Sequence, residues 1–254
     1  MMPDLISALP VFLAFILTLV ALSWCSRQIS EHIQLLAVNI TGSTNAATVA
    51  IFLVLLPGVI VHEAAHWITA YLLGLKPSKF RVWPKKQGKF LGLGSISIRS
   101  GGLLKDSLVG LAPLIVGTIL VAWITHRVLN AQMMASAMAL GQWRGALEAF
   151  LSAFRQQDGA LWAYLLFTIS NAMMPSPSDR EPVTPVVQYA LLAGLAYLLI
   201  GLPVGPLQSF VLWLTPFVQS VSSAFLFIIL LDLIVLLILF VLSEIFASAQ
   251  MRNS

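Results

Sequence analysis

Charged residues and cysteine are both scarce in this chain of 254 residues. Lysine, arginine, aspartate and glutamate make up 9% of the sequence, whereas a soluble domain carries about a quarter. The single cysteine, Cys25, excludes an intrachain disulfide and a cysteine-based zinc site. The net charge of +4 is small and dispersed, so we expect no nucleic-acid partner.

Apolar residues take the place of the missing charges. Hydrophobic residues make up 59% of the chain, and its mean hydropathy is +0.92. Several stretches exceed the ~18 apolar residues that indicate a transmembrane helix. We therefore expect an all-α, multi-pass protein embedded in the lipid bilayer, with about six transmembrane helices.

The expected spans divide the chain into three parts. They lie at residues 5–25, 48–74, 108–127, 160–174, 185–202 and 222–247. Pro57 and Gly58 indicate a bend in the second span, and Pro216 is expected to divide residues 207–248. Residues 26–47 are polar enough to leave the hydrocarbon, and "GQWRGALEAFLSAFRQQ" predicts an amphipathic interfacial helix. We assign residues 1–47 to a first span and outer connection, 48–182 to a functional core, and 183–254 to C-terminal helices.

Basic residues predict the orientation in the membrane. Eight of the 14 lysines and arginines lie between Lys76 and Lys105, so this loop is expected on the cytoplasmic side. The second span then ends on that side, and so does the fourth. We expect a prokaryotic cell membrane, with the functional site toward the cytoplasm.

Three ionisable residues interrupt the apolar stretch "LPGVIVHEAAHWITAYLLG" at residues 56–74. His62 and His66 are four residues apart, so both imidazoles lie on one helix face and can bind one zinc ion. Glu63 points ~100° away, where it can take a proton from a metal-bound water. Ionisable groups inside a membrane are costly and usually functional. The pattern HExxH therefore predicts one Zn²⁺ ion per chain, with Glu63 as general base.

A catalytic zinc site of this type needs a third protein ligand. Asp179 is the first candidate, because the expected topology brings the end of the fourth span to the side of His62 and His66. Asp106 and Asp232 are the alternatives, although Asp106 can cap a helix and Asp232 can serve helix packing. Asn171 could hold a substrate backbone or an oxyanion, or make an interhelical hydrogen bond.

Together these residues resemble the site-2 protease family of intramembrane zinc metalloproteases. That family has HExxH in a transmembrane helix and an aspartate ligand in a motif like Asn-x-x-Pro-x-x-x-x-Asp. In "NAMMPSPSD", Asn171, Pro175 and Asp179 stand in similar order, with the proline one residue later and no Leu-Asp-Gly. "SLVGLAPLIVG" is similar to the family's Gly-Pro segment, with Ala112 before Pro113. The resemblance covers residues 49–179.

The resemblance also implies a small β element and an activity. "KFRVWP" and "GSISIRS", on either side of "KKQGKFLGLG", are expected to form a β-hairpin or re-entrant β segment after the metal-binding helix. Its edge could capture an unwound substrate, although the basic residues there could instead anchor the loop at lipid headgroups. We expect zinc-dependent cleavage of a membrane-embedded peptide or protein. The alternative is a divalent-metal transporter that uses the same His, Glu and Asp residues.

Overall fold

Helices account for almost all of the regular structure. The computed structural model describes residues 2–83, 85–87, 90–92, 100–129 and 131–253, and side chains within 8–83, 100–129 and 131–246. The helices are α1 (Met2–Thr41), α2 (Thr44–Val54), α3 (Leu56–Leu72), α4 (Leu103–Arg127), α5 (Ala131–Ala139), α6 (Trp143–Arg155), α7 (Gly159–Ala172), α8 (Pro177–Arg180), α9 (Val183–Leu199) and α10 (Gly205–Asn253). This agrees with the predicted all-α class.

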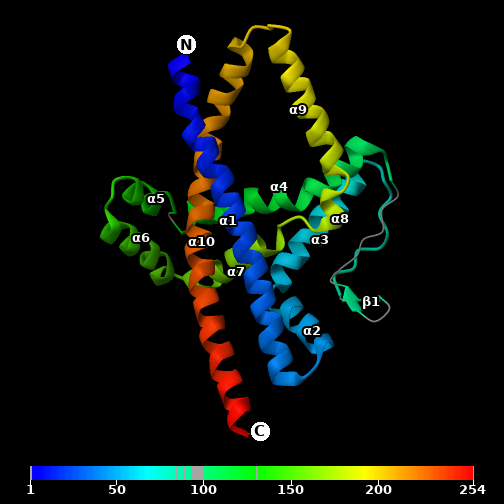
Figure 1. The fold of residues 1–254 in the computed structure, drawn as a ribbon, viewed down its shortest axis with the longest axis vertical. Helices are drawn as coiled ribbons and strands as arrows, with labels where there is room; N and C mark the ends of the chain where they lie inside the picture. Colours follow the sequence, from blue (N-terminus) through cyan, green and yellow to red (C-terminus); the bar gives the residue numbers. More distant parts are fainter. Residues whose placement is uncertain (1, 84, 88–89, 93–99, 130, 254) are drawn as a thin grey trace.

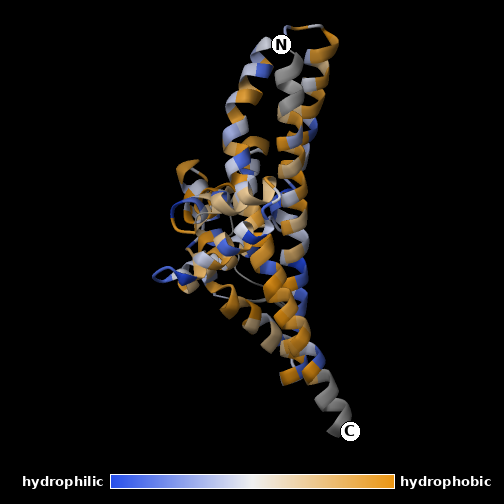
Figure 2. Cartoon of the chain, turned by 90° about the vertical axis from the view of Figure 1, so that its left-hand side faces the viewer, coloured by the Kyte–Doolittle hydropathy of each residue, from blue (hydrophilic) through white to orange (hydrophobic). Residues whose placement is uncertain are grey.

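The two terminal helices form the long axis of the molecule. α1 and α10 pack along each other, and α4 crosses them near the middle (Figure 1). Hydrophobic residues cover much of the surface of the long helices (Figure 2). The sequence assigned α1 and α10 to separate parts of the chain, but the two helices share an interface.

The described part of the chain contains four helices long and apolar enough to cross a membrane, or five if a bent pair counts as one. This fits an integral membrane protein, but the prediction of six spans is wrong. The expected fourth span is α7, whose 14 residues extend about 21 Å and fall short of a ~30 Å hydrocarbon core. α10 continues through Pro216 instead of dividing there. A proline does not end a helix in lipid when neighbouring groups form hydrogen bonds with the backbone carbonyl that it leaves unpaired.

α1 also extends beyond the expected first span. Residues 26–41 were predicted to leave the hydrocarbon, yet they continue the same helix. Arg27 and Glu31 form an i,i+4 ion pair at 3.0 Å there, which supports helical structure in a polar stretch. The polarity of this stretch was identified correctly, but it does not end the helix.

The predicted bend near Pro57 is present. α2 and α3 meet at Leu55 with a bend of 80°, and Pro57 lies in the first turn of α3. Proline is favoured there because the first N–H groups of a helix lack intrahelical partners. The bend gives α3 its own direction, independent of α2.

Two strands of three residues each lie between α3 and α4. β1 (Lys85–Gln87) pairs antiparallel with β2 (Phe90–Gly92). The sequence predicted a longer element flanked by residues 79–84 and 94–100, but residues 79–83 are not strand, and 84 and 93–99 lie outside the described residues. Pro84 has no N–H to donate to a strand ladder. The small β-hairpin or re-entrant β segment predicted from residues 79–84 and 94–100 is therefore not supported.

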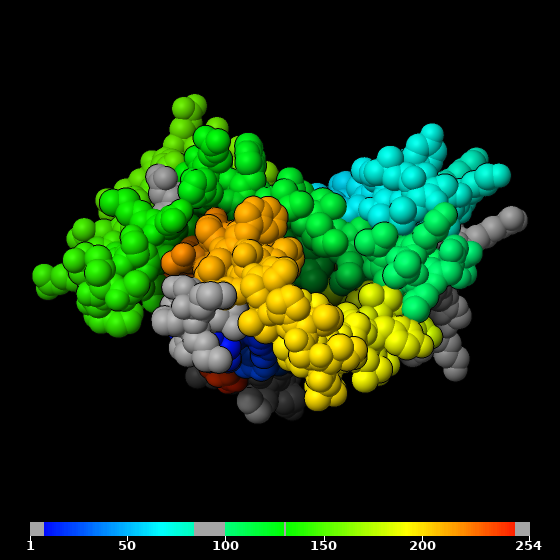
Figure 3. All heavy atoms as spheres, turned by 90° about the horizontal axis from the view of Figure 1, so that it is seen from above, coloured from blue at the N-terminus to red at the C-terminus, as the bar shows by residue number. Residues whose placement is uncertain are grey.

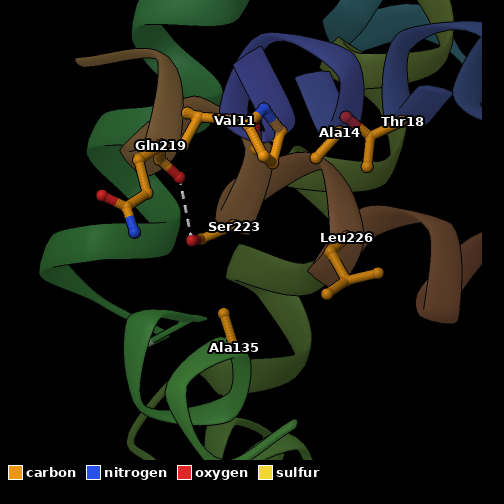
Figure 4. A pocket seen from close by; sticks show the side chains of 9 residues that line it. Val11, Ala14, Thr18, Ala135, Gln219, Ser223 and Leu226 are labelled. Carbon is orange, nitrogen blue, oxygen red and sulfur yellow. Dashed lines mark hydrogen bonds between the residues drawn. The ribbon is translucent and has the colours of Figure 1, made fainter. Parts of the chain in front are cut away.

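A pocket of about 290 Å³ lies between α1, α5 and α10. The hydroxyls of Thr18, Ser222 and Ser223 line it, but each donates to a carbonyl of its own helix, as Ser223 does to Gln219 at 2.9 Å (Figure 4). These donors are already used, so the pocket offers little for chemistry.

The amphipathic helix predicted between the third and fourth spans is α6. Ala146, Ala149, Phe150 and Ala153 are buried along one side, whereas its charged residues are exposed. Seen from above, α5 and α6 lie at one end of the molecule, and the end of α3 lies with the start of α4 at the other (Figure 3). α3 carries His62, Glu63 and His66 in its middle turns.

Candidate metal centre

The two histidines of α3 face the same space. His62 and His66 are one helical turn apart, and their Nε2 atoms lie 3.1 Å from each other. Their rings are nearly perpendicular, with centroids 4.7 Å apart. One turn of helix therefore places two imidazole nitrogens at one point, as the i,i+4 spacing predicts.

Asp179 of α8 completes the cluster. Its Oδ1 lies 3.2 Å from His66 Nε2, and its Oδ2 lies 3.7 Å from His62 Nε2. One ligand atom from each of the three residues lies within 4.8 Å of the others. Their side chains are 11–16% exposed, so protein encloses most of the cluster.

These separations fit a small cation. Two ligands bound at ~2.0–2.2 Å to a tetrahedral zinc ion lie about 3.3–3.5 Å apart. The two Nε2 atoms are 3.1 Å apart, and the nearest carboxylate oxygens lie 3.2 Å from His66 Nε2 and 3.7 Å from His62 Nε2, all close to that value. The three residues can therefore hold one metal ion with only small adjustments.

A proline fixes the orientation of His66. Val109 lies four residues before Pro113 in α4, and a proline has no N–H to donate to that carbonyl. The freed Val109 carbonyl lies 2.9 Å from His66 Nδ1. Because a carbonyl only accepts, His66 donates its Nδ1–H there and keeps the Nε2 lone pair for a ligand.

The end of α7 orients His62 in the same way. The Ala172 carbonyl lies 2.7 Å from His62 Nδ1. A continuing helix would have paired this carbonyl with the Ser176 N–H, but that N–H donates to Asp179 Oδ2 at 2.8 Å. The chain turn that positions Asp179 therefore also frees the carbonyl that orients His62.

The cluster brings three hydrogen-bond acceptors close together. With both Nδ1 atoms donating, the two Nε2 atoms and the Asp179 carboxylate are all acceptors facing one another. Acceptors brought this close repel unless a proton or metal cation lies among them. The electrostatics and the distances thus agree on a cation site.

Asp179 is held by its own turn and by α4. Its carboxylate accepts a hydrogen bond from the Ser176 hydroxyl at 2.7 Å. The Asp179 N–H donates to the same hydroxyl oxygen, and the two residues form a capping box. The Ser107 hydroxyl of α4 lies 2.6 Å from the Pro182 carbonyl and 2.7 Å from the Leu103 carbonyl of its own helix, and its one proton is shared between these two acceptors. The turn at residues 176–179 is therefore held next to α4, whose Val109 carbonyl also orients His66.

Gly110 allows α4 to approach this turn. A Cβ built on Gly110 would lie 2.3 Å from the Asp179 carbonyl oxygen, closer than real Cβ contacts allow. We predict that Gly110→Ala displaces Asp179 and lowers zinc affinity by ~10–100-fold, as for other losses of support to a ligand. Titration of the purified protein with zinc measures the effect.

Gly194→Ala is the matched control for this prediction. Gly194 lies in helix α9 with nothing within 4 Å of its built Cβ, so the same change should leave zinc affinity unaltered. Equal zinc affinity in Gly110→Ala and the wild type would show that this close approach does not position Asp179.

Glu63 lies beside the cluster. It is 7% exposed, one residue after His62 on α3, and its carboxylate interacts electrostatically with His66 and Asp179. It is not among the three converging ligands. A buried carboxylate next to the ligands, without being one, suits a general base.

Asn171 lies near the cluster but its amide is already engaged. Its Nδ2 donates to the Phe167 carbonyl and to Asp232, both at 2.9 Å. Flipping the amide would place two oxygens against each other at Phe167, so the assignment is firm. No N–H remains for an oxyanion, and the interhelical hydrogen bond is the alternative that the structure contains.

The two other candidate aspartates lie outside the cluster. Asp106 accepts from the Ser100 hydroxyl at 2.5 Å and from the Gly101 N–H at 2.8 Å, so it holds the residues before α4 against the first turn of that helix. Asp232 accepts a hydrogen bond from Asn171.

The sequence did not predict that the carbonyls of Val109 and Ala172 orient the two histidines. For Val109 a signal was present, because Pro113 lies four residues later and has no N–H for that carbonyl.

No family model, curated protein or solved structure matches this chain. A functional assignment therefore depends on the geometry of the site.

Proposed function

We propose that this protein is an intramembrane zinc metalloprotease, similar to the site-2 protease family. One observation carries the proposal: His62 Nε2, His66 Nε2 and the Asp179 carboxylate converge within 4.8 Å, beside the buried Glu63. Two imidazoles and one carboxylate form the ligand set of many catalytic zinc sites, which leave one position open. The pattern on α3 and the aspartate after Pro175 support the resemblance.

Each residue has a defined part in the proposed reaction. When bound, the metal ion would activate a water molecule and polarise the scissile carbonyl. Glu63 takes the proton from the attacking water and delivers it to the leaving amine. Val109 and Ala172 hold the two imidazoles in the tautomer that leaves Nε2 free. Asn171 has only its Oδ1 left as an acceptor for a substrate N–H, and that oxygen is buried without a partner among the described residues.

The substrate in this proposal is a peptide within or next to the membrane. The cluster lies on α8, which begins an apolar segment long enough to cross a bilayer, and on α3, which forms a bent apolar pair with α2. In this proposal the site faces the cytoplasm of a prokaryotic cell, an orientation favoured by the excess of basic residues in the loop at 76–105. An unwound segment would be needed, because helical peptide bonds are shielded from attack.

The competing proposal is a divalent-metal transporter. A transport path needs polar ligands through both leaflets. Among the described residues, the converging side chains of His62, His66 and Asp179 lie at one place. Glu63 also separates the two proposals, since a transporter needs no base that lies outside the ligand set.

Glu63→Gln tests the proposed chemistry. The amide keeps the size of the side chain and removes the base, so zinc content should persist. Cleavage of a transmembrane peptide bearing a fluorophore and a quencher, in proteoliposomes, should fall by ~10²–10⁴-fold.

Glu148→Gln is the control, because Glu148 lies exposed on α6. Its cleavage rate should equal that of the wild type. Normal cleavage by Glu63→Gln would exclude Glu63 as the base. Zinc uptake into liposomes by wild-type protein that cleaves nothing would favour transport.

A further inference from the structure

A buried aspartate connects the C-terminal helix to the end of α7. Asp232 lies in the apolar helix α10 and is 0% exposed. Its Oδ1 accepts a hydrogen bond of 2.9 Å from Asn171 Nδ2. Ionisable residues within membrane helices are costly, and they usually serve function. The sequence favoured a packing role for Asp232, and its partner indicates a more specific one.

The N-terminal helix reaches the same point of α7. The Asn171 carbonyl would normally pair with the N–H four residues later, but that residue is Pro175, which has none. The hydroxyl of Ser26, a buried residue of α1, donates to this carbonyl at 2.9 Å. α1 therefore satisfies the backbone group that the proline leaves unpaired.

The next carbonyl along the chain orients a candidate metal ligand. Ala172 follows Asn171 directly, and its carbonyl accepts from His62 Nδ1 at 2.7 Å. Asn171 is thus held by its side chain from α10 and by its backbone from α1. Any shift of this helix end moves the Ala172 carbonyl away from the imidazole.

We propose that Asp232 and Ser26 are positioning residues that hold His62 in its metal-binding tautomer and orientation. This inference rests on the proposed metal site, and it gives a role to α1 and α10, which lie outside the segment that resembles the site-2 protease family. The terminal helices act through Asn171 and the Ala172 carbonyl, and they touch neither ligand nor substrate.

The two side chains of this hydrogen bond are both buried. Asn171 Oδ1 and Asp232 Oδ2 have no protein partner among the described residues. The hydrogen bond from Asn171 to Asp232 is a polar contact that joins α7 to α10 inside the protein. Replacing Asp232 by Leu removes the acceptor and leaves an amide N–H of Asn171 buried and unpaired.

The test compares variants by the tautomer of His62 in the full-length protein. ¹⁵N-labelled histidine in lipid nanodiscs, at alkaline pH without added metal, shows which ring nitrogen carries the proton. Asp232→Leu should lower the Nδ1–H fraction of His62, and zinc titration should show ~10–100-fold weaker binding. Asp232→Asn keeps an acceptor oxygen for Asn171 and should restore both readouts.

Two further variants keep the test decisive if Asp232→Leu does not fold. Ser26→Ala should shift the His62 tautomer in the same direction. Ser222→Ala is its matched control, because that α10 hydroxyl bonds to a carbonyl of its own helix and should change nothing.

An unchanged His62 tautomer in folded Asp232→Leu, or in Ser26→Ala, would overturn the inference and leave Asp232 as a packing residue. The expected tautomer shifts in a protein without peptidase activity would overturn the proposed function and support this inference.

Discussion

Purified protein should carry about one zinc ion per chain, and His66→Ala should carry none. His66 is 9% exposed, and it is fixed on one side by the Val109 carbonyl. Without its Nε2, the site retains one imidazole and one carboxylate, too few to hold zinc against water. His62→Ala should have the same effect for the same reason. Elemental analysis of the protein, together with its molar concentration, measures the zinc content.

His32→Ala provides the control for this experiment. His32 also lies on a helix and contacts the carbonyl four residues before it through Nδ1, at 2.8 Å from Gln28. It is not part of the cluster. Its substitution should leave zinc content unchanged. Wild-type zinc levels in both His62→Ala and His66→Ala would refute the metal site.

Asp179→Ala should weaken zinc binding far more than Asp106→Ala. Asp179 places its two oxygens 3.2 and 3.7 Å from the histidine nitrogens, whereas Asp106 accepts hydrogen bonds from Ser100 and Gly101 before α4. Loss of a direct ligand should exceed the ~10–100-fold effect of losing a group that supports one. Competition with a chromophoric chelator measures both affinities.

The same pair of variants separates a binding defect from misfolding. Asp106→Ala removes the hydrogen bonds from Ser100 and Gly101 and should lower the stability of the protein by about 1 kcal/mol, with its zinc site intact. Asp179→Ala removes both a cap and a ligand. If the two variants bind zinc equally well, Asp179 is not the third ligand.

The residues of the cluster could be predicted because their signals are local. The spacing of His62 and His66 fixes their relation through helical geometry alone. Asp179 required a longer inference, from charge distribution to topology and from Pro175 to a chain break. The distances are consistent with that choice over Asp106 and Asp232.

The helix ends were predicted less well. Hydropathy alone cannot show that α1 continues to Thr41, that α7 stops after 14 residues, or that α10 passes through Pro216. Helix ends depend on partners for the last N–H and carbonyl groups, and those partners lie far along the chain. The number of predicted spans was therefore too high.

The sequence by itself determined the membrane class, the all-α structure and the pair of imidazoles, because composition and a 3.6-residue period suffice for these. Only the tertiary structure decided which atoms orient them. Val109 belongs to α4 and Ala172 to α7, and their carbonyls become acceptors for His66 and His62 only after these helices pack against α3. Asp232 likewise reaches Asn171 across 61 residues of chain. Hydrogen bonds between distant segments form when packing excludes water, and no local pattern encodes them.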